Sequence, residues 1–449
     1  MSVAPTPSAM VPLISEPVSR LAGRIQVPGD KSISHRALIL GALAVGRTSI
    51  EGLSEGADVM ATAQVLQALG AKLEHEAGQW MLSGVGIGGL RAPDQPLDFG
   101  NSGTGVRLMM GVLATHPFTS VLTGDPSLSA RPMDRVMSPL QSFGAQFEAR
   151  EPCLLPVIVR GAASAIPISH VLTVASAQVK SALLLAGLNA PGVTTIEEPV
   201  LTRDHTERLL NYFGAQLSIT NRDEGGVVIR LEGQPELHPA SLSVPGDPSA
   251  AAFPMVAALI VPEASIVIEN IMLNAGRNGL IEVLQEMGAH IRMVNKRQES
   301  GEDVADIEVA SGPLQGVHVA ASRVPSMIDE YPAFMVAAAY AQGDTVMEGL
   351  GELRVKETDR LTAMTALLEA NGVLHTLKGD NLTVHGQGVP PQGGGVVATH
   401  MDHRIAMAAL TLGVGAKQPV AVEDTRMIAT SFPNYVAVMT ALGARFKTP

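Results

Sequence analysis

The sequence predicts an α/β protein of two domains, each built from three copies of one repeated unit. An apolar, helix-like stretch that ends in Gly and leads through Ala or Val into a strand-like run recurs at intervals of roughly seventy to eighty residues. The six copies are VLQALGAKLE, PLQSFGAQFE, LLNYFGAQLS, VLQEMGAHIR, LLEANGVLHT and VMTALGARFK. The tetrapeptide Val-Pro-Gly-Asp occurs at 27–30 and again at 244–247, and so divides the six units into two halves of three.

The glycines of these copies mark the end of a helix in every unit. They are Gly70, Gly144, Gly214, Gly288, Gly372 and Gly443. Each stands where helices commonly end in a left-handed residue, a conformation that Gly adopts at low cost. Upstream, each unit begins with a helix that starts from a polar cluster, followed by a strand and a loop. Downstream, two strands joined by a turn close the unit, as at 71–74 with 80–83.

The last unit stops after one closing strand, 444–447, and the strand-like run 24–27 is free to complete it. We therefore expect one domain of residues 1–29 together with 246–449, holding both termini, and an inserted domain of residues 30–245. The chain would cross between the domains at hinge strands near 28–30 and 245–247. The first twenty residues contain four prolines and no basic or long apolar segment, which predicts a flexible leader and not a signal peptide.

Composition limits the partners of the protein. The net charge of −12 disfavours nucleic acid and anionic membranes, so an anion site must be built locally. The single cysteine, Cys153, excludes an internal disulfide framework and indicates a reducing compartment. The longest uncharged run, 181–196, is interrupted by Pro191 and Gly192 and is too short to span a bilayer. We expect a cytoplasmic protein with no membrane partner.

Charged and hydroxyl residues recur at the start of the first helix of the unit and in the loop before the second helix. If equivalent positions face one cleft, eight cations gather there: Lys31, Arg36, Arg107, Arg131, Arg203, Lys356, Arg360 and Arg404. Helix N-termini favour anions, and arginines hold carboxylates and phosphates in a fixed orientation. The pattern predicts a small ligand with two or more anionic groups.

Two acids in the same regions are candidates for proton transfer. Asp329 lies at a helix start among apolar residues, and Glu357 lies between Lys356 and Arg360 in VKETDR. One can act as base and the other as acid if their surroundings separate their pKa values. The chain has no GxxxxGK[ST] loop and no GxGxxG turn that opens a helix, and His400 and His403 lack a third metal ligand nearby. We therefore expect no metal, with these two histidines acting as a helix cap and an anion contact.

Eight motifs in chain order carry a resemblance to a known family. They are PGDKSISHRA, LDFGNSGTGVRL, ARPMDRV, SAQVKSALLLAGL, TRDHTERLL, MIDEYP, RVKETDRL and MDHRIAM. Together they resemble the 5-enolpyruvylshikimate-3-phosphate synthase (3-phosphoshikimate 1-carboxyvinyltransferase) family, nearer its second class, over about residues 20–449. The resemblance implies an inside-out α/β barrel of two domains, each of three βαβαββ units. It also implies transfer of the enolpyruvyl group of phosphoenolpyruvate to the 5-hydroxyl of shikimate 3-phosphate, with no cofactor. We expect a monomer.

The resemblance also assigns site residues. It places shikimate 3-phosphate on Lys31, Ser32, Arg36, Ser176, Ala177, Gln178, Arg203, Asp329 and Lys356. It places phosphoenolpyruvate on Lys31, Asn101, Gly103, Thr104, Arg131, Gln178, Arg360, His403 and Arg404. Asp329, Glu357 and Lys31 are the implied catalytic residues, with Asp329 taking the hydroxyl proton and Glu357 protonating the enol methylene.

Two departures concern the inhibitor glyphosate. Strongly tolerant members carry Ala where this sequence has Gly103, and the segment 274–277 lacks the Thr expected before Arg277. We therefore expect intermediate or greater sensitivity. Two alternative functions remain: the sister enolpyruvyl transferase acting on UDP-N-acetylglucosamine, and a non-catalytic anion-binding scaffold. The sister enzyme usually has a reactive Cys in the loop equivalent to 124–131, which has none here, and the intact acids argue against a scaffold.

Overall fold

Six four-stranded sheets, one for each repeat, organise the fold of the computed structural model, which describes residues 10–449. In every sheet the first and second strands are parallel, and the second pairs antiparallel with the fourth, which pairs with the third. In four of the sheets one helix connects the first two strands; in the other two, those of the first and fourth units, the first strand leads into a helix of the other lobe. A second helix precedes the third strand of each sheet. The predicted α/β fold with six repeats is confirmed, and the complete unit is βαβαββ.

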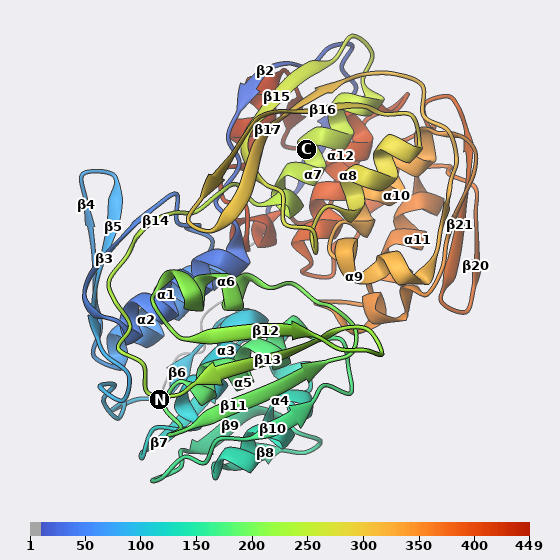
Figure 1. Ribbon diagram of the computed structural model, residues 1–449. Helices are drawn as coiled ribbons and strands as arrows, with labels where there is room; N and C mark the ends of the chain where they lie inside the picture. The colour runs from blue at the N-terminus through green and yellow to red at the C-terminus, as the bar shows by residue number, and fades with distance from the viewer. Residues whose placement is uncertain (1–9) are drawn as a thin grey trace, which may run out of the picture.

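The first three units form the blue-to-green lobe of Figure 1. Their helices are α1 (Lys31–Leu43), α2 (Ala57–Ala68), α3 (Gly103–Leu113), α4 (Asp134–Leu140), α5 (Ala177–Gly187) and α6 (His205–Tyr212). Their strands are β3 (Val45–Glu51), β4 (Lys72–Glu76), β5 (Gln79–Val85), β6 (Leu97–Asp98), β7 (Thr119–Thr123), β8 (Gln146–Arg150), β9 (Leu154–Arg160), β10 (Ser169–Val171), β11 (Val193–Glu198), β12 (Leu217–Asn221), β13 (Val227–Glu232) and β14 (Ser241–Ser243).

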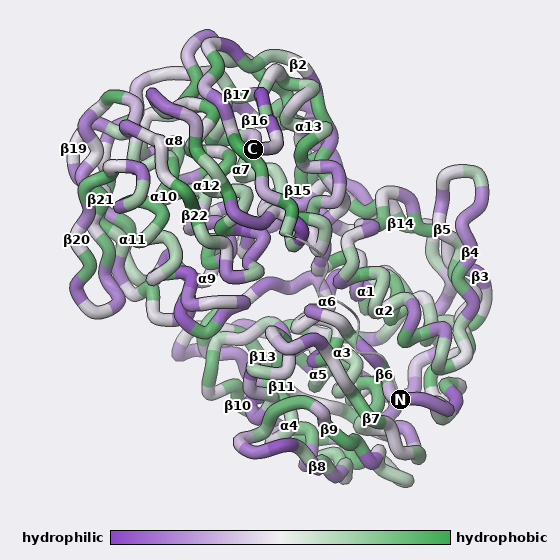
Figure 2. Tube along the Cα trace, turned by 180° about the vertical axis from the view of Figure 1, so that it is seen from behind, coloured by the Kyte–Doolittle hydropathy of each residue, from purple (hydrophilic) through white to green (hydrophobic). Residues whose placement is uncertain are grey.

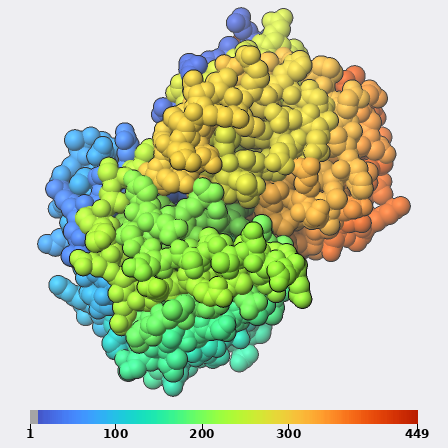
Figure 3. Space-filling view, viewed as in Figure 1, coloured from blue at the N-terminus to red at the C-terminus, as the bar shows by residue number. Residues whose placement is uncertain are grey.

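The last three units, with the N-terminal strands, form the second lobe. Its helices are α7 (Pro248–Ile260), α8 (Gly279–Glu286), α9 (Val324–Met327), α10 (Tyr331–Tyr340), α11 (Arg360–Ala370), α12 (His403–Gly415) and α13 (Tyr435–Leu442). Its strands are β1 (Leu13–Glu16), β2 (Ala22–Ile25), β15 (Ser265–Met272), β16 (His290–Glu299), β17 (Glu302–Ala310), β18 (His318–Val319), β19 (Gln342–Met347), β20 (His375–Lys378), β21 (Asn381–Gln387), β22 (Val396–Val397), β23 (Val420–Val422) and β24 (Arg445–Lys447). The two lobes are separate masses in the surface view of Figure 3.

Helices form the centre of each lobe and sheets form its outside (Figures 1 and 2). Every residue of α7, α10 and α12 is buried, and these three helices contact one another. Helices buried on all sides must be apolar all round, which explains why their sequences show no polar face. Buried hydrophobic residues form two clusters, one spanning 33–244 with Met272 added, the other spanning 21–27 and 250–444.

The predicted helix boundaries are confirmed by their backbone geometry. The six repeat glycines all have φ between 73° and 110°, the left-handed region. Polar side chains cap the first helices: Asp30 accepts a hydrogen bond from the backbone N–H of Ile33, and Ser102, Ser176, Asp247 and Asp402 act alike. No helix within 10–449 is long and apolar enough to cross a membrane.

The prediction that the run 24–27 completes the sixth unit was wrong, because this run belongs to another sheet. The sixth sheet is completed by β1, which pairs antiparallel with both β23 and β24, while β2 pairs in parallel with β15 in the fourth sheet. The leader prediction is therefore wrong for β1. Pro12 and Pro17 lie just outside this four-residue strand, so the prolines bound it and remove no ladder hydrogen bond. The part of the leader at residues 1–9 lies outside the described residues.

The two Val-Pro-Gly-Asp segments lie side by side where the chain crosses between the lobes. Asp30 N donates to Pro245 O (2.7 Å), and Asp247 N donates to Pro28 O (2.9 Å). Strand β2 belongs to one lobe and leads into α1 of the other, while β14 does the reverse on its way into α7. A Cβ on Gly29 would lie 1.9 Å from the carbonyl oxygen of Gly52, so only glycine fits at this crossing.

Candidate functional site

A cavity of about 440 Å³ lies between the two lobes and is lined by residues of both. It contains most of the predicted site residues: Lys31, Ser32, Arg36, Gly103, Thr104, Arg131, Ser176, Ala177, Gln178, Arg203, Asp329, Lys356, Glu357 and Arg404. Arg107 also lines it, so seven of the eight predicted cations face one space, and Arg360 is the exception. Positions that correspond in the repeats therefore do converge, although they lie up to about 370 residues apart in the sequence.

Several helices begin at this cavity. Among them are the first helices of the first four units, α1, α3, α5 and α7, whose Lys31, Gly103, Ala177 and Ser249 line it. Their positive dipole ends add to the field of the cations. The cavity is therefore suited to an anion with several charged groups.

Lys31 and Arg36 occupy defined positions at the start of α1. Lys31 Nζ pairs with Asp58 Oδ2 at 3.0 Å, and Asp58 Oδ1 is buried without a partner. Arg36 donates from Nε to Thr206 Oγ1 (2.6 Å), from Nη2 to Ser181 Oγ (2.7 Å) and from Nη1 to a backbone carbonyl. Burial lowers the pKa of Arg36 to about 10, which still leaves it a cation at neutral pH. Asp58 was not among the predicted site residues. The signal that could have identified it is its position in the first turn of α2, because charged residues also stand near the start of the second helix in other units.

Arg131 is fixed by its own lobe and reaches toward the other. Its Nη2 donates to Asn101 Oδ1 (2.5 Å) and to Ser127 Oγ (3.1 Å), and its Nη1 lies 3.9 Å from Glu357 Oε1. Gln178 beside it donates to Thr104 Oγ1 at 3.1 Å. Asn101, a predicted phosphoenolpyruvate contact, is not among the residues that line the cavity, and its hydrogen bond orients Arg131.

Asp329 sits between α9 and α10 and is surrounded by cations from both lobes. Its Oδ2 accepts from Arg203 Nη2 at 2.8 Å, and its Oδ1 lies 3.5 Å from Arg360 Nη1. Burial acts to raise the pKa of Asp329, but Arg404, then Arg203, Lys356 and Arg360, together hold it well below its usual range. Asp329 is therefore an ionised carboxylate at neutral pH, the form that accepts a proton.

Glu357 lies in the loop before α11 and pairs with Arg360 through Oε2. Burial acts to raise its pKa, but Arg360, followed by Arg131 and Lys31, keeps the pKa well below the usual value. Both predicted acid–base residues are thus ionised here. Lys356 next to it is buried, and burial lowers its pKa.

Two predicted phosphoenolpyruvate contacts lie behind the cavity wall. Arg360 is buried, with Nε donating to Asp402 Oδ2 at 2.7 Å. His403 is buried with no partner on Nε2, and burial, followed by Lys31 and Arg404, holds its pKa well below its ordinary value, so it is neutral. His400 is exposed, and the cap of α12 is Asp402, so the predicted cap role of the histidines is wrong. Asp402 caps the helix because a carboxylate at the N-cap position accepts hydrogen bonds from the free N–H groups of the first turn.

Arg277 is buried at the crossing between the lobes. Its Nη1 lies 3.1 Å from Asp30 Oδ2 and its Nη2 lies 3.0 Å from Asp247 Oδ1. These carboxylates cap α1 and α7, the helices that begin on either side of the crossing. Arg277 therefore links the two segments on which the lobes meet.

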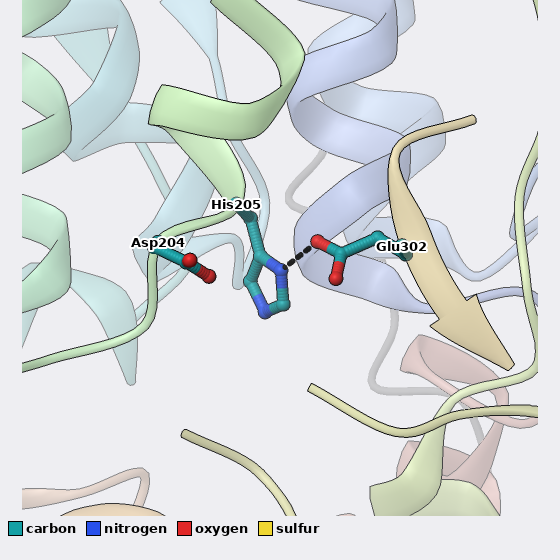
Figure 4. A group of neighbouring side chains, drawn as sticks. All are labelled: Asp204, His205 and Glu302. Carbon is teal, nitrogen blue, oxygen red and sulfur yellow. Dashed lines mark hydrogen bonds and ion pairs between the residues drawn. The ribbon is translucent and has the colours of Figure 1, made fainter. Parts of the chain in front are cut away.

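Asp204, His205 and Glu302 form the one group of potential metal ligands found among residues 10–449 (Figure 4). His205 Nδ1 lies 2.7 Å from Glu302 Oε1, which joins α6 of one lobe to β17 of the other. Asn274 Nδ2 donates to Asp204 Oδ1 (2.6 Å) and to Glu302 Oε2 (3.1 Å). Because protein donors already satisfy these carboxylates, the group serves as a contact between the lobes and we assign no metal to it.

The fold and the cavity define a class: inside-out α/β proteins that bind an anionic ligand between two lobes, with ionised carboxylates beside it. Residues 15–439 match the profile of the EPSP synthase (3-phosphoshikimate 1-carboxyvinyltransferase) family, and the chain belongs to this family.

Two relatives and one solved structure show how close the similarity is. Proteins named 3-phosphoshikimate 1-carboxyvinyltransferase from Parvibaculum lavamentivorans and Rhodospirillum rubrum are each 56% identical, the first over 97% of this chain and 96% of the relative, the second over 96% and 97%. The EPSP synthase structure from Acinetobacter baumannii is 40% identical, with a TM-score of 0.86 over 98% of this chain and 100% of that one.

Proposed function

We propose that the protein transfers the enolpyruvyl group of phosphoenolpyruvate to the 5-hydroxyl of shikimate 3-phosphate and releases phosphate. The observation that carries this proposal is one interlobe cavity holding Lys31, Asp329 and Glu357 among seven cations. Family membership and the names of the relatives support the same activity. The domains are residues 1–29 with 246–449, and 30–245, a division supported by the two hydrophobic clusters.

The two substrates would occupy adjoining parts of the cavity. Shikimate 3-phosphate lies on the start of α1, the start of α5 and Arg203, where the helix N-termini and Arg36 attract its phosphate. Phosphoenolpyruvate lies beside Gly103, Arg131 and Arg404. Lys31 and Gln178 are placed to touch both. Arg360 and His403 act from behind the wall, Arg360 by its pairing with Glu357.

The reaction has two steps in which atoms and charges balance. In the addition, Asp329 accepts the proton of the 5-hydroxyl, the oxygen bonds to C2 of phosphoenolpyruvate, and Glu357 gives a proton to C3. In the elimination, Glu357 takes a proton back from C3, the bond from C2 to the phosphate oxygen breaks, and the phosphate departs with the proton that Asp329 accepted, so both carboxylates return to their starting states. Lys31 and the arginines stabilise charge on the departing phosphate, and they are already in place before the reaction begins.

Glu357 must carry a proton to act as the acid, although its pKa lies well below the usual value in this structure. An anion bound to Arg131 and Lys31 would compensate two of the cations that hold the pKa down. The pKa of Glu357 then rises, and the residue takes up a proton as the second anion binds.

This rise predicts proton uptake. Titrating phosphoenolpyruvate or an unreactive analogue into the shikimate 3-phosphate complex near neutral pH should take up as much as about one proton for each site. Calorimetry in buffers of different ionisation enthalpy measures it. The Glu357→Gln variant should lose this part of the uptake and keep whatever the ligand phosphates contribute. Equal uptake by both proteins would contradict the assignment.

Phosphate release tests the function itself. Phosphoenolpyruvate with shikimate 3-phosphate should support turnover, whereas phosphoenolpyruvate with UDP-N-acetylglucosamine should not. Turnover with the nucleotide sugar alone would favour the sister transferase, and turnover with neither would favour a binding scaffold.

Gly103 is the position at which glyphosate sensitivity can be tested. A Cβ there would lie 3.0 Å from Arg131 Nη1 and 3.0 Å from Arg107 Nη1, so both guanidinium groups must shift. We expect Gly103→Ala to raise the inhibition constant of glyphosate by about tenfold or more, equivalent to about 1.4 kcal/mol. The KM for phosphoenolpyruvate should rise less. The glyphosate inhibition constants of the wild type and of Gly103→Ala, measured at matched substrate saturation, test this prediction. An unchanged inhibition constant would contradict it.

A further inference from the structure

Three charged side chains lie buried beneath the cavity and have no part in the proposed chemistry. Lys180 Nζ lies 2.8 Å from Glu198 Oε2 and 2.7 Å from Glu207 Oε1. All three side chains are at most 3% exposed, and none of them lines the cavity. They come from α5, the end of β11 and α6, so the group ties together three elements of one unit.

One branch of this group leads to Arg203. The second oxygen of Glu198, Oε1, accepts hydrogen bonds from Thr202 N at 2.9 Å and Thr202 Oγ1 at 2.5 Å. Thr202 is the residue immediately before Arg203, in the loop between β11 and α6. Lys180 therefore holds Glu198, and Glu198 holds the loop from which Arg203 reaches across to Asp329.

The other branch leads to Arg36. Ser181 follows Lys180 on α5, and Thr206 precedes Glu207 on α6. The hydroxyls of Ser181 and Thr206 lie 2.6 Å apart and both accept hydrogen bonds from Arg36. The ion pair between Lys180 and Glu207 thus fixes the spacing of the two helices at the level where they hold this arginine.

A contribution to folding stability does not explain the buried group of Lys180, Glu198 and Glu207. Burying three ionisable groups costs desolvation that apolar residues of the same volume avoid. Burial raises the pKa of Glu207, and its Oε2 has no hydrogen-bond partner. The network carries this desolvation cost and is linked both to Arg36 and to the loop of Arg203. Orientation of these two arginines therefore explains it better.

We propose that Lys180, with Glu198 and Glu207, is a positioning residue that sets the separation and direction of Arg36 and Arg203 for the phosphate of shikimate 3-phosphate. The proposal rests on the proposed function, because it assumes this ligand. It assigns Lys180 no contact with either substrate.

The test uses Lys180→Met and the triple variant Lys180→Met, Glu198→Gln, Glu207→Gln. Binding of shikimate 3-phosphate alone is measured by calorimetry, KM for each substrate by phosphate release, and Tm by thermal unfolding. Lys180→Met leaves two carboxylates without their cation and should lower Tm as well as affinity. The triple variant has no unpaired buried charge and should recover much of the Tm.

Affinity separates positioning from a structural role. We expect Kd and KM for shikimate 3-phosphate to rise by about 10- to 100-fold in both variants, with KM for phosphoenolpyruvate changed by less than about threefold. The exposed Lys72→Met variant, on β4 of the same lobe, is the control and should match the wild type.

Each other outcome overturns something definite. If the triple variant regains wild-type affinity along with its Tm, or if both KM values rise together, Lys180 has only a structural role. If the wild type does not bind shikimate 3-phosphate, the proposed function fails, and this proposal fails with it. Wild-type binding with unchanged variants overturns the positioning role alone.

Discussion

Replacing Asp329 with Asn should lower kcat by about 10²- to 10⁴-fold, the usual contribution of a general base. The amide keeps the size of the side chain and can still bond to Arg203, but it cannot accept the 5-hydroxyl proton. Steady-state phosphate release at saturating concentrations of both substrates measures the loss. Because the cations around Asp329 hold its pKa well below the usual range, the wild-type residue stays ionised down to mildly acidic pH.

The control for this experiment is Asp344→Asn, on β19 of the same lobe. Asp344 is exposed and pairs with His385, and neither residue lines the cavity. Its kcat should stay within about twofold of the wild type, as for most surface substitutions. An Asp329→Asn protein that turned over at a similar rate would show that another group, or water, takes the proton.

Replacing Glu357 with Gln should also lower kcat by about 10²- to 10⁴-fold, because the carbon–hydrogen bond at C3 must form and break through a proton that Gln cannot supply. Gln still accepts a hydrogen bond from Arg360, so the arginine keeps its position. Exchange of solvent deuterium into C3 of phosphoenolpyruvate, followed by NMR, reports this step more directly than turnover. The variant should show almost none.

Glu348→Gln is the matched control, since Glu348 is partly exposed and its partner is His318. Wild-type exchange in Glu348→Gln, with none in Glu357→Gln, assigns the proton to Glu357. If Glu357→Gln loses the exchange but keeps its kcat, turnover does not depend on proton transfer through Glu357, and Glu357 is not the acid.

The repeat made most of the fold predictable from one sequence. Six glycines at helix ends and polar residues at helix starts are local signals, because they set the backbone conformation at the position where they stand. All six glycines are left-handed in the structure. Strand β1 was missed because four residues between two prolines carry no periodicity, and its pairing with β23 and β24 is decided by contacts about 400 residues away in the sequence.

The candidate site was predictable as a set of residues but not as a geometry. Corresponding positions in the repeats indicated which charges would converge, yet the sequence could not tell which side chains face the space. Arg360 and Asn101 are not among the residues that line the cavity, and each is held by another polar side chain, Asp402 and Arg131 respectively. The buried Lys180 group was not predicted because Lys180 and Glu207, taken alone, resemble surface charges of amphipathic helices, and Glu198 resembles an exposed acid at the end of a strand.

Two adjacent chain crossings differ mechanically from one flexible linker. A single linker is a pivot that permits rotation in every direction, whereas two segments bonded to each other define a line. Pro28 to Asp30 and Pro245 to Asp247 form such a line, with Arg277 bridging the two carboxylates. Two segments bonded in this way resist twisting and sliding of one lobe against the other more than they resist rotation about the line itself. Lys31, one residue past Asp30, lies next to this line.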